Sequence, residues 1–294
     1  MPTVPLSDEL AQQALDLVEQ HGGEVQASKA SGINRETLKH RHNVALRRGM
    51  TPTKLDRVFR QSETGHAVLV IPDSHSPFMH PDAIPFLTEA KSRLKPTRVV
   101  HLGDEVDNHA LSQYDPDPDG DSAGVELHKA KEELQGLYSI FPEVRLCHSN
   151  HGVRPFKKAY RAGIPRTWLK DYATVLESPA GWRWEERWEI DGVIYMHGEG
   201  FGGNTAHLKW AQINGKPTVI GHIHSHAGIN YVKSEYGQIW GMNTGCLIDY
   251  KQYAFKYAKH TPHKPVIGVG FVDNGSPFFF PMRLHDNGRW TGKW

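Results

Sequence analysis

Cysteine, long apolar runs and an excess of one charge are all missing from this sequence. It has two cysteines, Cys147 and Cys246, in 294 residues. Two cysteines exclude a disulfide framework and a thiolate metal cluster, so we expect both to lie reduced in a core. No stretch approaches the roughly 20 apolar residues of a membrane-spanning helix, and the start MPTVPLSDELAQQ lacks the apolar segment of a secretion signal. We therefore expect a soluble protein of the cytoplasm, with no membrane contact.

The charge is balanced, since 34 Lys and Arg residues face 33 Asp and Glu residues, for a net charge of +1. Any attraction to nucleic acid must therefore come from a local patch. Histidine, by contrast, is abundant, with 19 residues. Because imidazole is the commonest metal-binding side chain, this abundance raises the expectation of a metal site.

The pattern of apolar residues divides the chain into two parts. We expect a small helical domain at 1–50, a linker or short docking helix at 51–65, and a large domain at 66–294. In the large domain, runs rich in Val and Ile alternate with helical patterns, which is typical of an α/β fold with buried strands. We expect strands at 67–71, 98–103, 143–149, 181–190, 192–198, 217–223 and 266–272, and helices at 81–94 and 123–141.

The small domain has helical patterns at about 7–20, 24–32 and 33–49, with Ser7 and Asn34 placed as caps. Three short helices with a tight turn before the last resemble a helix-turn-helix domain of the homeodomain-like kind. We expect its core to include Ala11, Ala14, Leu15, Val18, Leu38, Val44 and Leu46.

The third helix of this domain is strongly basic, with five cations against one acid, Glu36. This asymmetry suits a helix that lies along a phosphate backbone, so we expect nucleic acid, with DNA favoured, as its partner. A solvated basic helix on a bundle that binds protein is the alternative. The cations are Arg35, Lys39, Arg41, Arg47 and Arg48.

Five successive apolar runs of the large domain end on Asp, Asn or His. In open α/β sheets, ligands bind at the ends of strands. Carboxylate, amide and imidazole groups without thiolate suit Mn, Fe or Zn. Each motif alone has an ordinary role as a turn, cap or core residue, but five in order favour a metal site. The residues are Asp73 and His75, Asp104 and Asp107, Asn150 and His151, His197, and His222 and His224.

These motifs, read in order as DSH, GDEVD, SNHG, HG and GHIH, resemble those of the calcineurin-like metallophosphoesterases over about residues 66–250. The family shows Asp-x-His, Gly-Asp-x-x-Asp, Gly-Asn-His-Asp/Glu, a lone His and Gly-His-x-His. The third motif departs from this pattern, since Ser149 replaces Gly and Gly152 replaces the acid. That departure concerns substrate contacts rather than metal binding. The resemblance implies a β-sandwich flanked by helices, in the layer order αββα.

The resemblance also implies two divalent metal ions, with manganese favoured over iron, zinc, nickel and cobalt. Asp104 would bridge the two ions, and the other ligands would lie at rigid strand ends, which fix them accurately. The first ion would be held by Asp73, His75, Asp104 and His224, and the second by Asp104, Asn150, His197 and His222.

The mechanism implied by the resemblance is attack on phosphorus by a hydroxide that bridges the two ions. His151 would lie outside the ligand set and assist the leaving group or bind the transition-state oxygens. Asp107 would orient His151, although it could simply cap the turn after Asp104. Arg154 is the candidate phosphate clamp.

The substrate class depends on local features, because the family includes phosphatases, nucleotidases, cyclic-nucleotide phosphodiesterases and nucleases. Asn108 stands where the protein phosphatases have a phosphate-binding Arg, which weakens that class. Segment 151–172 interleaves six cations with aromatic residues, which suits a nucleic-acid strand. An amphipathic helix with its aromatic residues in the core explains this pattern equally well. The aromatic residues are Phe156, Tyr160, Trp168 and Tyr172.

Three further features are ambiguous. The tryptophans of 181–190 favour one strand with a large buried face over a stacking platform. The Gly-rich segment 198–210 is expected to be a flexible loop at the mouth of the site. His207 and His226 could approach the metals, although neither occupies a family ligand position.

We therefore expect a two-metal phosphodiesterase or nuclease that the helix-turn-helix domain brings to nucleic acid. This domain pairing is associated with bacterial or phage enzymes, so we expect the cytoplasm of a bacterial or phage-infected cell. The second hypothesis is a phosphomonoesterase that acts on a nucleotide or phosphoprotein, with the small domain as a docking module. A DNA-binding protein with a vestigial metal site comes third, because the ligand set is complete.

Overall fold

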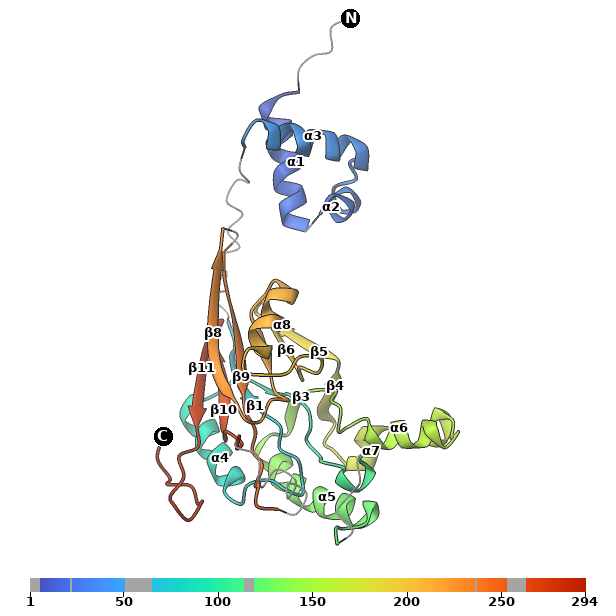
Figure 1. Ribbon diagram of the computed structural model, residues 1–294, viewed down its shortest axis with the longest axis vertical. Helices are drawn as coiled ribbons and strands as arrows, with labels where there is room; N and C mark the ends of the chain where they lie inside the picture. Colours follow the sequence, from blue (N-terminus) through green and yellow to red (C-terminus); the bar gives the residue numbers. More distant parts are fainter. Residues whose placement is uncertain (1–5, 22, 51–64, 114–118, 236, 253–262) are drawn as a thin grey trace, which may run out of the picture. The chain divides into compact units, whose positions relative to one another are not determined.

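The computed structural model describes residues 6–21, 23–50, 65–113, 119–235, 237–252 and 263–294 (Figure 1). The chain divides into two compact units, Met1–Arg60 and Gln61–Trp294. The boundary falls within the predicted linker 51–65, of which residues 51–64 lie outside the described residues. Within the described ranges, no helix combines the length and the apolar character needed to cross a membrane.

The first unit consists of helices α1 (Asp8–His21), α2 (Glu24–Ser31) and α3 (Arg35–Arg47). Its caps lie where the sequence predicts them. The Leu10 N–H donates to Ser7 Oγ over 3.3 Å, and the Glu36 N–H donates to Asn34 Oδ1 over 2.9 Å. These bonds satisfy backbone donors that a helix start leaves without a partner.

The core of the first unit lies among all three helices. The buried side chains are Ala11, Ala14, Leu15, Ala27, Leu38 and Ala45, with Val18 and Val44 partly buried against them. The prediction that Leu46 belongs to this core is wrong, since Leu46 is 54% exposed. Leu38 and Ala45 are seven residues, or about two helical turns, apart and so share the inner face of α3. Leu46 lies about 100° further round the helix.

Arg48 is tied to the start of α1. Its Nη1 lies 2.6 Å from Asp8 Oδ1, and its Nη2 donates to the Leu6 carbonyl oxygen over 2.9 Å. The sequence assigns Arg48 to the phosphate-binding set, but here it has a structural role within the unit. The other cations of α3 are Arg35, Lys39 and Arg47, which are exposed, and Arg41, which is half-buried.

The second unit contains two mixed β-sheets. The strands of the first sheet are β1 (Ala67–Ile71), β2 (Arg98–His101), β3 (Glu143–Cys147), β4 (Gly181–Glu185), β10 (Gly268–Asp273) and β11 (Ser276–Pro281). Those of the second are β5 (Arg187–Ile190), β6 (Val193–Met196), β7 (Thr218–Ile220), β8 (Ala227–Ser234) and β9 (Gly237–Thr244).

The strand orders are β11-β10-β1-β2-β3-β4 and β5-β6-β7-β9-β8. Strands β1 to β4 run parallel, as do β6, β7 and β9. Parallel neighbours bring their carboxyl ends to one edge of each sheet, which is where the polar motifs follow in the sequence.

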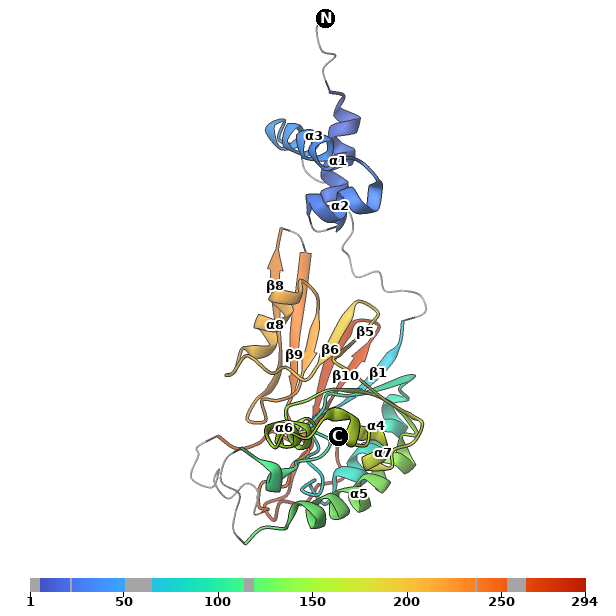
Figure 2. The same cartoon turned by 90° about the vertical axis from the view of Figure 1, so that its right-hand side faces the viewer.

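The helices of the second unit lie on the outer faces of the sheets and in the connections (Figures 1 and 2). They are α4 (Ala83–Leu94), α5 (Ala123–Ile140), α6 (Arg154–Arg161), α7 (Tyr172–Leu176) and α8 (Ala206–Asn214), with 3-10 turns η1 (His109–Leu111) and η2 (Arg166–Trp168).

Strand β1 shows how the layers are built. Val68 and Val70 pack with residues of the second sheet, such as Tyr195, in one buried cluster. Leu69 and Ile71 point to the other face and pack with side chains of α4 and α5. This alternation is the normal period of a strand, and it places one core between the sheets and another under the helices. Helix α8 contacts β7 and β9, and the α/β class predicted from the sequence is confirmed.

The prediction of a single strand at 181–190 is wrong. The segment forms two strands, β4 and β5, which belong to different sheets. The Trp182 Nε1–H donates to the Phe141 carbonyl oxygen and the Trp188 Nε1–H to the Leu146 carbonyl oxygen, both over 2.8 Å. These indoles are therefore anchored within the second unit and do not form a stacking platform. The two cysteines are free and buried, as predicted.

Candidate metal centre

Five strand ends deliver polar side chains to the same edge of the two sheets. Strand β1 is followed by Asp73 and His75, β2 by Asp104 and Asp107, β3 by Asn150 and His151, β6 by His197, and β7 by His222 and His224. These side chains form three overlapping groups whose ligand atoms lie close enough together to hold a metal ion.

The first group consists of Asp73, His75, Asp104 and His224, whose candidate ligand atoms all lie within 4.8 Å of one another. His224 Nε2 is 3.0 Å from Asp73 Oδ2 and 3.2 Å from His75 Nε2. His75 Nε2 is 3.5 Å from Asp104 Oδ2. The structure thus brings together the four residues predicted for the first ion.

The second group contains Asp104, His197 and His222, again with ligand atoms within 4.8 Å of one another. His197 Nε2 lies 3.4 Å from Asp104 Oδ2 and 3.1 Å from His222 Nδ1. Asn150 Oδ1 is 2.7 Å from the same His197 nitrogen. Asp104 therefore belongs to both groups, and its Oδ2 faces one imidazole from each sheet.

The polar atoms of these groups fit divalent cations. Asp73 Oδ1 is buried and has no hydrogen-bond partner, which is costly for a carboxylate oxygen unless a cation approaches it. Imidazole nitrogens face each other between His75 and His224 and between His197 and His222. Oxygen and imidazole donors without thiolate suit Mn, Fe or Zn, so these groups could hold metal ions.

Two of the imidazoles are oriented by hydrogen bonds at Nδ1. His75 Nδ1 lies 2.5 Å from Asp107 Oδ1, and His197 Nδ1 lies 3.0 Å from the Leu102 carbonyl oxygen. Because these oxygens accept, the proton of each neutral ring sits on Nδ1 and the Nε2 lone pair points into the site. This is the usual arrangement for a metal-binding histidine.

The electrostatics of four candidate ligands favour protonation states that bind metal. Burial by itself raises the pKa of Asp104, but attraction to His197 and the neighbouring imidazoles outweighs it and holds the pKa well below its usual value. The same balance of burial and attraction to His197 lowers the pKa of Asp73. Burial also lowers the pKa of His75 and His222. Anionic carboxylates and neutral imidazoles are the forms that ligate metals. His197 differs, because burial lowers its pKa but attraction to Asp104 and Asp73 outweighs burial and raises it.

Three of the candidate ligands have a left-handed backbone conformation: His75 (φ 52°), Asp104 (φ 51°) and His222 (φ 64°). This region costs energy for most non-glycine residues and is concentrated at functional sites. Hydrogen bonds hold the turns in place, since the His75 N–H donates to the Asp104 carbonyl oxygen and the His222 N–H to Asp73 Oδ2, both over 2.8 Å. The turns direct consecutive side chains toward one point.

Asp107 and His151 form the third group, together with His75 of the first group. His151 Nδ1 is 2.7 Å from the Asp107 carbonyl oxygen and 3.2 Å from Asp107 Oδ1. The Asp107 carboxylate thus contacts both His151 and the candidate ligand His75. A simple turn cap after Asp104 does not account for these contacts.

Arg154 lies against His151. Its Nη1 donates to the Asp107 carbonyl oxygen over 2.7 Å, and its Nη2 lies 3.0 Å from His151 Nε2. A guanidinium group can only donate, so His151 Nε2 is the acceptor in this contact. Arg154 is therefore positioned by the site itself, and it also lines the cleft that opens from the site.

Ser149 is one of the two positions at which the third motif differs from the metallophosphoesterase pattern that it resembles. Its Oγ accepts from the Asp104 N–H over 2.8 Å and from the Gly152 N–H over 3.4 Å. A Cβ at Gly152 would lie 3.3 Å from Ser149 Oγ and 3.3 Å from Tyr172 Oη, so an acid there would crowd both hydroxyls. Asn108 Nδ2, where the protein phosphatases have Arg, donates to the His151 carbonyl oxygen over 3.0 Å.

His101 supports the site and was missed at the sequence level, because it lies inside the apolar run that forms β2. Burial lowers its pKa to about 4, so the ring is neutral. Its Nδ1 accepts from the Gly103 N–H over 3.2 Å, and its Nε2 lies 3.0 Å from Ser74 Oγ. His101 therefore joins the turn after β2 to the turn after β1.

His207 and His226 do not belong to the ligand groups found among the described residues. Their rings stack on each other, with centroids 5.5 Å apart, and His207 Nε2 lies 2.7 Å from Asn230 Oδ1. The expectation that they could approach the metals gains no support. Glu199 and Gly200, from the segment 198–210 predicted to be a loop, do line the cleft beside Asn150 and His222. The prediction is wrong for residues 206–210, which belong to helix α8.

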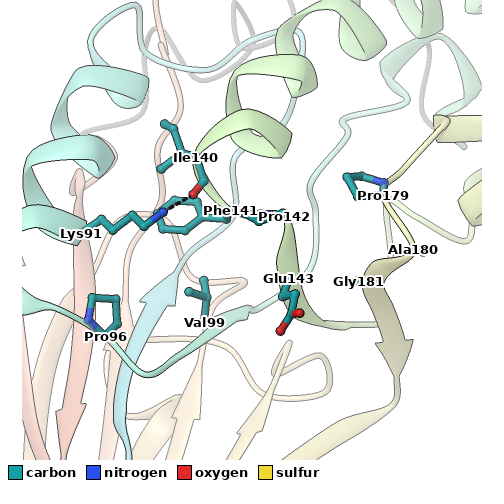
Figure 3. Close-up of a pocket in the computed structure, with 10 residues that line it drawn as sticks. All are labelled: Lys91, Pro96, Val99, Ile140, Phe141, Pro142, Glu143, Pro179, Ala180 and Gly181. Atoms are coloured by element: carbon teal, nitrogen blue, oxygen red, sulfur yellow. Dashed lines mark hydrogen bonds between the residues drawn. The ribbon is translucent and has the colours of Figure 1, made fainter.

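A hollow of about 450 Å³ lies elsewhere, between the start of β3 and the start of β4 (Figure 3). There Lys91 Nζ donates to the Ile140 carbonyl oxygen over 2.5 Å and lies over the Phe141 ring. This hollow is at the amino ends of the parallel strands, whereas ligands of α/β sheets bind at the carboxyl ends. We therefore place the functional site at the Asp and His groups.

No protein-family model matches the chain, and no curated protein is significantly similar to it. The chemistry must therefore be argued from the side chains that the strand ends bring together.

We expect Asp104→Asn to weaken metal binding by at least about 10–100-fold, the cost of losing even an outer-shell partner. The amide keeps an acceptor for the His151 N–H but removes the negative charge that both groups share. Metal content per chain after dialysis against manganese measures the effect. Asp171→Asn is the matched control, because it exchanges one good N-cap residue for another at an exposed helix start. An unchanged metal content in Asp104→Asn would contradict the ligand assignment.

Proposed function

We propose that the chain is a two-metal-dependent phosphoester hydrolase of the calcineurin-like metallophosphoesterase family, and that its substrate is a nucleic-acid phosphodiester. The observation that carries the proposal is the position of Asp104 Oδ2, 3.5 Å from His75 Nε2 and 3.4 Å from His197 Nε2. One carboxylate shared by two ligand groups suits a binuclear centre. The order of the five motifs and the layers of helices and sheets support the same assignment.

Two bound divalent ions, with manganese favoured, would supply an activated water and neutralise charge on the phosphoryl group. The side chains of the chain itself divide the remaining tasks. Asp73, His75 and His224 hold one position, Asn150, His197 and His222 hold the other, and Asp104 belongs to both. The polar residues beside them bind and orient the phosphoester.

His151 is the candidate for proton transfer to the leaving oxygen. Burial lowers its pKa, but attraction to Asp104 and the contact with Asp107 outweigh burial and raise it. Its Nδ1 is held by the Asp107 carbonyl oxygen, so Nε2 is the atom that can exchange a proton. Arg154 donates a hydrogen bond to that nitrogen. A phosphate oxygen would draw the guanidinium away, because charged oxygens are stronger acceptors than imidazole. Substrate binding would thereby free Nε2 for a proton.

The first unit is proposed to be a helix-turn-helix domain that binds nucleic acid. Helix α3 offers Arg35, Lys39, Arg41 and Arg47 for phosphate contacts, while Arg48 is used within the unit. Such contacts give affinity without sequence preference.

The substrate class can be tested with chromogenic esters. With manganese present, we expect faster hydrolysis of the diester bis-p-nitrophenyl phosphate than of the monoester p-nitrophenyl phosphate. The reason is that Asn108 stands where the protein phosphatases have a phosphate-binding Arg and is engaged with the His151 carbonyl oxygen, so this position offers no guanidinium to a monoester dianion. Asp104→Asn, assayed in parallel, should be inactive on both esters. A faster monoester rate would favour the phosphomonoesterase hypothesis.

We expect His151→Ala to reduce turnover roughly 10²–10⁴-fold on a dinucleotide, whose alkoxide leaving group needs a proton. The loss should be much smaller for nitrophenolate, which leaves without one. Metal content should stay unchanged, because His151 belongs to neither predicted ligand set. His148→Ala is the control, an exposed histidine three residues away on the same connection. Equal losses on both leaving groups would indicate charge stabilisation instead of proton transfer.

Deletion of residues 1–50 should preserve the rate on small diesters and weaken binding to long DNA. The log–log dependence of DNA affinity on salt should become shallower by about 0.9 per lost phosphate contact. Lys39→Ala should make this salt dependence shallower by the amount expected for one phosphate contact. Lys29→Ala, which removes an exposed lysine of α2, should leave it unchanged. If deletion changes neither DNA cleavage nor its salt dependence, the basic face of α3 is solvated or docks protein, and the phosphomonoesterase hypothesis becomes the favoured one.

A further inference from the structure

Helix α6 and the turn η2 belong to an arm, residues 151–170. Figure 1 shows α6 extending outward from the rest of the second unit. None of the eight residues of α6 is buried, and Lys157, Lys158, Tyr160 and Arg161 are exposed. Residues 152–170 include six cations and no acid. This local charge, in a chain that is almost neutral overall, suits a polyanion.

Four of these cations form a stripe that leads away from the candidate metal centre. Their spacing of i, i+3, i+4 and i+7 places them on one face of the helix. They line a cleft of about 330 Å³ together with the candidate ligands Asn150 and His222, and Glu199 is the one acid among its described lining residues. The stripe consists of Arg154, Lys157, Lys158 and Arg161.

The arm also exposes two large aromatic side chains. Tyr160 is 84% exposed and Trp168 is 82% exposed, which excludes the interpretation that places all aromatic residues of 151–172 in the core. Phe156 is half-buried, and the guanidinium carbon of Arg166 lies 3.9 Å from its ring centre. Flat apolar faces held in solvent on a basic element suit the stacking of unpaired bases.

The aromatic and cationic surfaces adjoin. Tyr160, Phe156 and Ile164 line a groove of about 410 Å³, and Lys157 and Arg161 line both this groove and the cleft to the metal centre. A ligand that combines regularly spaced negative charge with flat apolar rings would contact both surfaces at once.

We propose that the arm binds a single strand of nucleic acid, with phosphates along the stripe and bases stacked on Tyr160 and Trp168. The strand would lead into the metal centre, so this inference rests on the proposed function and names its substrate as single-stranded. Helix α6 is about 12 Å long, so its cationic face can run beside more than one phosphate of an extended strand. A duplex hides its bases within the stack and offers the aromatic residues nothing to contact.

The test measures binding without cleavage, using the full chain with a chelator present. Fluorescence anisotropy of a labelled oligo-dT strand should show a loss of affinity of roughly 5–150-fold for Tyr160→Ala, and the same for Trp168→Ala, the usual effect of losing one stacked base. The same strand annealed to oligo-dA should show no such loss. Tyr160→Phe, which keeps the ring, should bind the single strand like the unaltered chain.

Tyr231→Ala is the matched control, because Tyr231 is 54% exposed on β8, away from the arm. It should bind both probes normally. Photocrosslinking of a bromodeoxyuridine strand gives a second measurement, and the crosslinked peptide should contain Tyr160 or Trp168. Crosslinks confined to other peptides, or alanine variants that bind the single strand normally, would overturn the inference.

Equal losses on single strand and duplex would also overturn it, since they would indicate contact with the backbone alone. If the chain cleaves phosphodiesters but its Tyr160 and Trp168 variants bind the single strand normally, the proposal that the arm binds the strand is refuted. The proposed hydrolase activity then still stands. If the chain cleaves no phosphodiester but binds single strands through Tyr160 and Trp168, the proposed hydrolase activity is refuted. The proposal that the arm binds the strand then still stands.

Discussion

The second unit is organised around one buried carboxylate, Asp104. It is 1% exposed, and a buried charge without compensation costs several kcal/mol. Compensation comes from both sheets, because Asp104 Oδ2 faces His75 from the turn after β1 and His197 from the end of β6. The two sheets must therefore present their carboxyl strand ends to the same point, and the left-handed turns at Asp104 and His75 make this possible.

The residues around this carboxylate form a continuous set of hydrogen bonds. Ser149 holds the Asp104 backbone, and His101 joins two of the strand-end turns. Such a shell fixes ligands within the small tolerances that a metal site needs. Ser149 and Gly152 fit together in this shell, because the serine hydroxyl occupies space that an acidic side chain at 152 would need.

Most of the elements and the polar strand ends could be predicted from sequence, because apolar periodicity and the residues that interrupt it are local properties. Features that depend on partners far along the chain could not. Segment 181–190 divides into β4 and β5 because the two strands pair in different sheets. The pairing of Arg48 with Asp8 spans 40 residues. The exposure of Leu46 depends on which face of α3 the other helices cover. His101 resembles any polar residue in a strand until its contact with Ser74 is known.

Helix α6 connects the site to the surface that we propose for the strand. Its first residue, Arg154, contacts His151 Nε2, and the same helical face continues as the cationic stripe. A phosphate that enters this stripe would compete with His151 for the guanidinium and would win, because a charged oxygen is the stronger acceptor. The position of Arg154 thus joins the surface proposed for the strand to the residue proposed as the acid.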